Sequence, residues 1–189
     1  MLINKAIQRS IKFILFLQLL AFVCFNTSAT QIYTNYTKYN RFNVKGQLVG
    51  ELASDPDGSG ALKFAATRYT YNSANQLIKR EAGELASWQD DSVAPKDWVN
   101  FTVLSSQVYT YNNKGLKATT SYRDSNGTTI RFIQKGYDSL NRLECEANRL
   151  NPNTFNTDST NACDATYSST YGYDRVTKYE YDDYGIRTY

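Results

Sequence analysis

A short pattern recurs five times along this chain: an aromatic residue, then Asn or Asp, two variable positions, and finally Gly or Asn. A type I turn favours Asn or Asp at its first position, and Gly and Asn tolerate the left-handed conformation needed at its last position. Such a turn joins two antiparallel strands through a bulge. The predicted turn residues are Asn43, Gly46, Asn72, Asn75, Asn112, Gly115, Asp138, Asn141, Asp182 and Gly185.

Tyrosines placed at alternate positions precede several of these turns. Examples are Tyr69 with Tyr71, and Tyr109 with Tyr111. Alternate residues of an extended strand point to the same face of a sheet, so each pair forms an aromatic stripe. The sequence therefore predicts an all-β chain of consecutive antiparallel hairpins, which form a curled sheet or a partial β-shell.

The tyrosine-containing turn unit resembles the YD repeat of RHS proteins and teneurins. Residues 55–78 resemble a whole unit, with a Gly-rich turn, a strand that ends in Tyr-x-Tyr and a second turn, and residues 124–143 are similar. The resemblance covers most of residues 40–189. It implies an RHS-like β-repeat chain without a toxin or cargo domain, and one too short to enclose a cargo. The expected function is that of a non-catalytic surface interaction module or a truncated remnant of an RHS-type shell.

The spacing of the five turns is uneven. The intervals between their aromatic residues are 29, 40, 26 and 44 residues, which indicates insertions at about 82–103 and 148–165. The second insertion contains Cys163, while Cys145 lies on the strand before it. In an oxidising compartment this pair predicts a disulfide, with two buried thiols as the alternative.

The N-terminal residues 1–29 have the layout of a cleavable signal peptide. Three basic residues precede an apolar run, and small residues follow it, so cleavage is expected after Ala29. This leaves residues 30–189 as one repeat domain and removes Cys24. The protein is therefore expected to be secreted, periplasmic or at the cell surface, with membrane contact only through the export signal. The alternative is an uncleaved membrane anchor, for which the apolar run is short.

Charge and composition exclude several classes of function. The formal net charge of +3 comes from Lys5, Arg9 and Lys12, and the rest of the chain is neutral on balance. No electrostatic footprint of a nucleic-acid binder remains. The chain has no histidine, which rules out a Ser-His-Asp relay and a histidine metal site. No cofactor and no metal are predicted.

The first insertion contains both tryptophans of the chain and offers a candidate ligand site. Flat aromatic rings beside carboxylates are typical of sugar recognition, and the candidate residues are Trp88, Asp90, Asp91, Asp97 and Trp98. In the alternative interpretation, the insertion folds back and its tryptophans cover an open end of the sheet.

An acid and base pair is not expected from the adjacent Asp90 and Asp91, because neighbouring side chains of a strand face opposite sides. The chain is therefore not predicted to be an enzyme. The expected partners are a cell-surface glycan or protein, or a second copy that pairs through open sheet edges.

Overall fold

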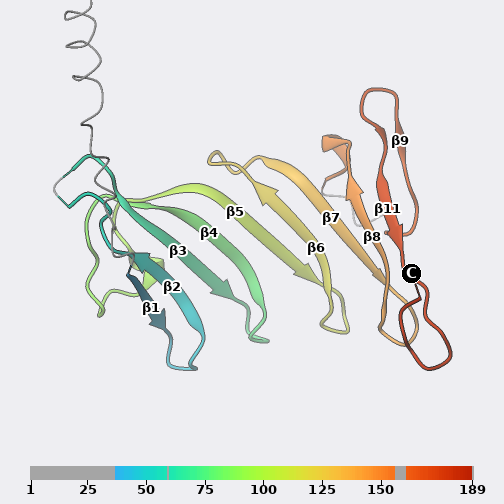
Figure 1. Ribbon diagram of the computed structural model, residues 1–189, viewed down its shortest axis with the longest axis horizontal. Coiled ribbons are helices and arrows are strands. Elements are labelled where there is room, and N and C mark those ends of the chain that lie inside the picture. Colours follow the sequence, from blue (N-terminus) through green and yellow to red (C-terminus); the bar gives the residue numbers. More distant parts are fainter. Residues whose placement is uncertain (1–36, 59, 156–160, 189) are drawn as a thin grey trace, which may run out of the picture. The chain divides into compact units, whose positions relative to one another are not determined.

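The computed structural model describes residues 37–58, 60–155 and 161–188. Nine strands form one antiparallel sheet in the order β1-β2-β3-β4-β5-β6-β7-β8-β11 (Figure 1). The strands are β1 (Lys38–Phe42), β2 (Leu48–Ala53), β3 (Phe64–Tyr71), β4 (Leu77–Leu85), β5 (Phe101–Tyr111), β6 (Lys117–Arg123), β7 (Thr129–Tyr137), β8 (Leu143–Arg149) and β11 (Arg175–Lys178). The all-β fold of consecutive hairpins is confirmed, and the sheet is open, with β1 and β11 at its edges.

The remaining elements of the described residues are short. A separate hairpin consists of β9 (Tyr167–Ser168) and β10 (Gly172–Tyr173). Two single turns of 3₁₀-helix, η1 (Pro95–Asp97) and η2 (Pro152–Thr154), lie in the two insertions.

Four of the predicted turns connect β1 to β2, β3 to β4, β5 to β6 and β7 to β8, at the same end of the sheet (Figure 1). Their last residues, Gly46, Asn75, Gly115 and Asn141, all have a positive φ, between 62° and 78°. The register shifts by one residue beside each turn, as a bulge requires. The fifth turn, with Gly185 at φ 77°, is flanked only by a single bridge between Tyr181 and Arg187.

From the second turn on, the tyrosine that begins each turn bonds to the preceding hairpin. The Tyr71 hydroxyl donates to the Leu48 carbonyl at 2.9 Å, and the Tyr111 hydroxyl donates to the Leu77 carbonyl at 2.7 Å. The same bond recurs from Tyr137 to Lys117 and from Tyr181 to Leu143, at 2.9 Å in both cases. In every case the acceptor is the residue six positions after the aromatic residue of the previous turn. This tyrosine ladder therefore fixes each hairpin against the one before it.

The strands extend further into both insertions than the sequence indicated. β4 continues to Leu85 and β5 begins at Phe101, so the first insertion is residues 86–100 rather than about 82–103. β8 continues to Arg149, so the second insertion starts after that residue. In both places, pairing with a neighbouring strand extends the ladder beyond the predicted boundary.

The predicted disulfide joins Cys145 of β8 to Cys163 of the second insertion and is confirmed. A buried ion pair fixes the same insertion, because Arg149 and Asp174 lie 2.9 Å apart with side chains that are 3% and 1% exposed. Arg149 also donates to Gln134, while Asp174 accepts from the Leu150 amide and from Thr166. Every charged atom of this pair therefore has a partner, which buried charges require.

The predicted signal peptide, residues 1–29, lies outside the described residues. Within the part of the chain that the structure describes, no helix is both long and apolar enough to cross a membrane.

Candidate functional site

The first insertion folds back over β2 and β3 and packs into the sheet. Its Trp98 belongs to a buried cluster with Leu52, Ala66 and Leu85. This close packing depends on Gly50 of β2. A Cβ atom at that position would lie 2.4 Å from Pro95 Cγ and 2.9 Å from Trp98 Cη2, which no real contact allows. Because Gly50 has no side chain, Pro95 and Trp98 of the insertion can pack directly against the backbone of β2.

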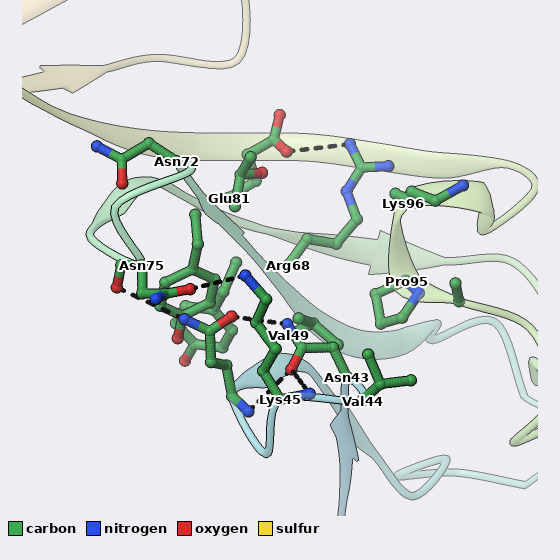
Figure 2. A pocket seen from close by; sticks show the side chains of 15 residues that line it. Asn43, Val44, Lys45, Val49, Arg68, Asn72, Asn75, Glu81, Pro95 and Lys96 are labelled. Atoms are coloured by element: carbon green, nitrogen blue, oxygen red, sulfur yellow. Dashed lines mark hydrogen bonds and ion pairs between the residues drawn. The ribbon is translucent and has the colours of Figure 1, made fainter.

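A cavity of about 520 Å³ opens between this insertion and the first two turns, and we call it the turn cavity (Figure 2). Turn residues form one side, β3 and Glu81 form the floor, and η1 with the residue before it forms the other side. Its lining residues are Asn43, Val44, Lys45, Gln47, Val49, Arg68, Tyr69, Thr70, Tyr71, Asn72, Asn75, Glu81, Ala94, Pro95 and Lys96. The volume falls in the range of sites that bind small molecules.

The floor of the turn cavity carries an ion-pair network. Arg68 of β3 and Glu81 of β4 are directly opposite each other in the sheet, and their side chains lie 3.2 Å apart. Lys79 contacts the second carboxylate oxygen of Glu81 at 2.6 Å, and the Arg68 guanidinium lies 4.1 Å from the centre of the Phe101 ring. The Glu81 carboxylate thus contacts two cations, and the net charge of these three side chains is positive.

Two lysines lie on opposite sides of the turn cavity. Lys45 comes from the first turn and donates to Asn75 Oδ1 of the second turn at 3.0 Å. Lys96 of η1 has a side chain that is 80% exposed and contacts the neighbouring Asp97 at 2.7 Å. Figure 2 shows Lys45 and Asn75 on the turn side, and Lys96 with Pro95 on the insertion side.

The two lining tyrosines are held by hydrogen bonds. Tyr71 is part of the tyrosine ladder, and the Tyr69 hydroxyl donates to Glu51 at 2.5 Å. Burial raises the pKa of Tyr69, and the hydrogen bond to Glu51 raises it further. The hydroxyl is therefore protonated at neutral pH and remains a hydrogen-bond donor to Glu51.

The structure places the two candidate tryptophans in different environments. Trp98 is 5% exposed, in the cluster beneath the insertion, and does not present a ring face to solvent. For Trp98 this agrees with the interpretation in which the insertion folds back and covers the sheet, and not with a sugar contact. Trp88 is 41% exposed and lies edge-on to Tyr39, with ring centroids 4.8 Å apart. Neither tryptophan lines the turn cavity.

The three candidate aspartates do not converge on one point. Asp90 accepts from the Ser92 amide and hydroxyl, which lowers the pKa of Asp90. Asp91 lies 2.5 Å from the buried guanidinium of Arg41, and Asp97 pairs with Lys96. These contacts stabilise the insertion itself. Among residues 37–58, 60–155 and 161–188, no group of three or more potential metal ligands comes together.

The sequence interpretation missed the residues that do converge on the turn cavity. Lys45, Arg68 and Lys96 come from a turn, a strand and an insertion that are distant in the sequence. Lys45 carried one usable signal, its place in a turn that the pattern had already predicted. For Arg68 and Lys96 the sequence held no comparable signal, because the fold of the insertion brings them to the same cavity.

No protein-family model matches the chain, and no curated protein matches it either. Among solved structures, the chain is similar to one in the "Crystal Structure of TcdB2-TccC3-Cdc42", with 14% sequence identity and a TM-score of 0.36. The similarity covers 80% of this chain and 7% of the length of that chain. A likeness at this level is a distant one and carries no argument about activity or partners.

Proposed function

We propose that this chain is an exported, non-catalytic protein of the RHS/YD-repeat type that acts as a surface interaction module. The supporting observation is the turn cavity, which two consecutive repeat turns and one insertion build together. A single hairpin could not form such a concave surface. The signal-peptide pattern of residues 1–29 supports export, and the resemblance to YD repeats is consistent with a remnant of an RHS-type shell.

A binding role is favoured over a catalytic one by the chemistry of the turn cavity. Among the described residues, Glu81 is the one carboxylate that lines it, and both of its oxygens contact cations. A general acid or base needs a proton that it can exchange with a substrate, and a second group to complement it. Glu81 is instead suited to hold Arg68 in place.

Export can be tested by expressing the full chain in a bacterial host and determining the N-terminus of the protein outside the cytoplasm. We expect the exported protein to begin at Thr30. Retention of residues 1–29 on a membrane-bound protein would contradict cleavage and favour an anchor.

The interaction role can be tested by labelling the purified protein and measuring its binding to the surface of cells from its source. We expect saturable binding that Ala94→Trp abolishes, because the larger side chain would fill the turn cavity without changing its charge. Ala61→Trp is the matched control, since Ala61 is exposed and does not line the cavity. Equal binding by both variants would argue against the turn cavity as the contact site.

A second candidate function is carbohydrate binding at Trp88. The half-exposed Trp88 ring with Tyr39 beside it favours this, since exposed aromatic rings stack on sugars. A glycan array should then show binding that Trp88→Ala removes and that Trp98→Phe, a substitution in the buried cluster, leaves unchanged.

A further inference from the structure

We propose that the turn cavity binds a short acidic peptide segment of a partner protein, one that combines carboxylate side chains with aliphatic ones. This inference rests on the proposed function and names the ligand class of the same site. Three observations support it: the charges of the cavity lining, the apolar side chains between those charges, and the absence of Trp88 and Trp98 from the lining.

The cavity lining has a positive charge balance. Lys45, Arg68 and Lys96 face one carboxylate, that of Glu81. The ion-pair partners just outside the lining, Lys79 and Asp97, have opposite charges and leave this balance unchanged. The excess of positive charge stands out because the chain after residue 29 is neutral on balance. A concave surface with this excess attracts anions and disfavours cationic partners.

The three cations are spread around the cavity. Arg68 is held on the floor by Glu81 and by the Phe101 ring. Lys45 and Lys96 extend from opposite sides, and each has an exposed ammonium group with a single side-chain partner at the surface, Asn75 for Lys45 and Asp97 for Lys96. A ligand with several separated carboxylates can contact more than one of them.

Aliphatic side chains lie between the charged groups. Val44 at the tip of the first turn is fully exposed, and Val49, Ala94 and Pro95 add further apolar surface. An exposed valine at a turn tip gains from burial when a partner covers it. The cavity therefore offers contacts both to carboxylates and to aliphatic groups, which an acidic peptide with aliphatic residues presents together.

A glycan ligand is less well matched to this cavity. The two tryptophans on which sugar recognition would depend lie elsewhere. The side chains of Asn43 and Asn72 are already used within their own turns, where each accepts from backbone amides and donates to a glutamine. Few free amide groups therefore remain for sugar hydroxyls.

The test uses fluorescence anisotropy of the purified protein with a labelled short peptide of alternating glutamate and leucine. We expect saturable binding, and binding at least about tenfold weaker for the same peptide with glutamine in place of glutamate. Raising the salt from about 50 mM to about 500 mM should also weaken the binding, because partly exposed charges are screened.

The key variant is the double substitution Lys45→Gln with Lys96→Gln, which should weaken binding of the glutamate peptide about tenfold. Both side chains are exposed, so the fold should be kept, and circular dichroism checks this. Lys114→Gln is the matched control, because Lys114 has the same position in the third turn as Lys45 in the first but does not line the cavity. This control should bind like the unmodified protein.

Several results would overturn the inference. Equal affinity for the glutamate and glutamine peptides would show that charge is not recognised. An equal loss with Lys114→Gln would show general electrostatic attraction rather than a site. Binding of trigalacturonate without binding of the peptide would favour an acidic glycan. If the peptide fails to bind while Ala94→Trp still abolishes cell-surface binding, the ligand class is wrong and the proposed function stands.

Discussion

At the scale of single residues, the tyrosine of the repeat has a role beyond filling one face of the sheet. Its ring lies on the sheet, and its hydroxyl reaches the backbone of the hairpin before it. Burial raises the pKa of both Tyr111 and Tyr137, so these hydroxyls keep the proton that the ladder needs. The first turn has Phe42 in this place. A phenylalanine provides the aromatic ring without the hydroxyl.

Removing one hydroxyl of the ladder should lower stability. Tyr111→Phe loses the bond to the Leu77 carbonyl, and we expect a decrease of about 1 kcal/mol in the free energy of unfolding. Urea unfolding followed by circular dichroism measures this. Tyr184→Phe is the control, because Tyr184 is 90% exposed and should tolerate the change. Equal effects of the two variants would mean that the ladder does not stabilise the fold.

The left-handed turn residues give a second prediction. Asn141 has a φ of 65°, a conformation that alanine disfavours and glycine accepts. Asn141→Ala should therefore lower the free energy of unfolding by about 1 kcal/mol, while Asn141→Gly should leave it nearly unchanged. Urea midpoints compare the two, with Ser139→Ala in the same turn as the control. A glycine variant as unstable as the alanine variant would exclude backbone conformation as the reason for Asn at this position.

At the scale of elements, two insertions replace tight connections and are fixed in different ways. The first packs on the sheet through Trp98 and Pro95, which the absence of a side chain at Gly50 allows. The second is held by the Cys145–Cys163 disulfide and by the buried pair of Arg149 and Asp174. Only the first insertion contributes to the turn cavity.

Gly50→Ala should displace the first insertion. The added Cβ would overlap Pro95, and we expect a loss of about 1 to 3 kcal/mol together with a change in tryptophan fluorescence. Replacing Pro95 by alanine in the same protein should recover part of this loss, because it removes the closest ring atom. A double-mutant cycle measures the coupling. Purely additive effects would contradict direct contact between these two positions.

The second insertion should respond to acid. Burial by itself raises the pKa of Asp174, but hydrogen bonds from Thr166 and the Leu150 amide, with the Arg149 contact, outweigh it and hold the pKa below its usual value. The stabilisation is therefore complete above about pH 4, near the pKa of an unfolded aspartate, and is lost as the pH falls through the folded value.

Asp174→Asn tests this dependence. At pH 7 we expect it to lower the free energy of unfolding by about 3 kcal/mol or more, because Arg149 is left buried without its counter-charge. The difference from the unmodified protein should shrink as the pH is lowered below about 4. Urea unfolding across this range provides the measurement, and a difference that does not change with pH would contradict the linkage.

At the scale of the whole molecule, the described part of the chain is dominated by one open nine-stranded sheet, beside the short β9–β10 hairpin. The exception to sequence order is β11, which pairs with β8 across the second insertion. Such linear arrangements gain stability from contacts between adjacent units, so their ends open more easily than their centre.

Hydrogen exchange should show this gradient. The amides of β4 and β5, with paired strands on both sides, should exchange more slowly than those of the edge strands β1 and β11. Native-state exchange measured by NMR or mass spectrometry provides the comparison. Uniform protection from β1 to β11 would indicate a single cooperative unit.

The open edges bear on the proposed self-association of copies. β1 carries Lys38, and β11 carries Arg175 and Lys178. Basic residues on edge strands oppose pairing with a similarly charged edge. Pairing of β1 with β11 of a second copy would thus place like charges together. We therefore expect these charges to oppose pairing between copies, and self-association stays a prediction.

The sequence by itself determined the hairpins, because a turn depends on the conformational preferences of a few adjacent residues. Asn and Gly at fixed spacing were enough to locate the four turns between strands and the fifth at the end. The pair of cysteines likewise predicted the disulfide.

The tertiary structure alone decided which insertion residues turn inward: Trp98 is buried and Trp88 is half-exposed, although both are tryptophans in one loop. It also brought Lys45, Arg68 and Lys96 together. The physical reason is that packing against Gly50 and the neighbouring strands depends on contacts between distant residues, which local preferences do not encode.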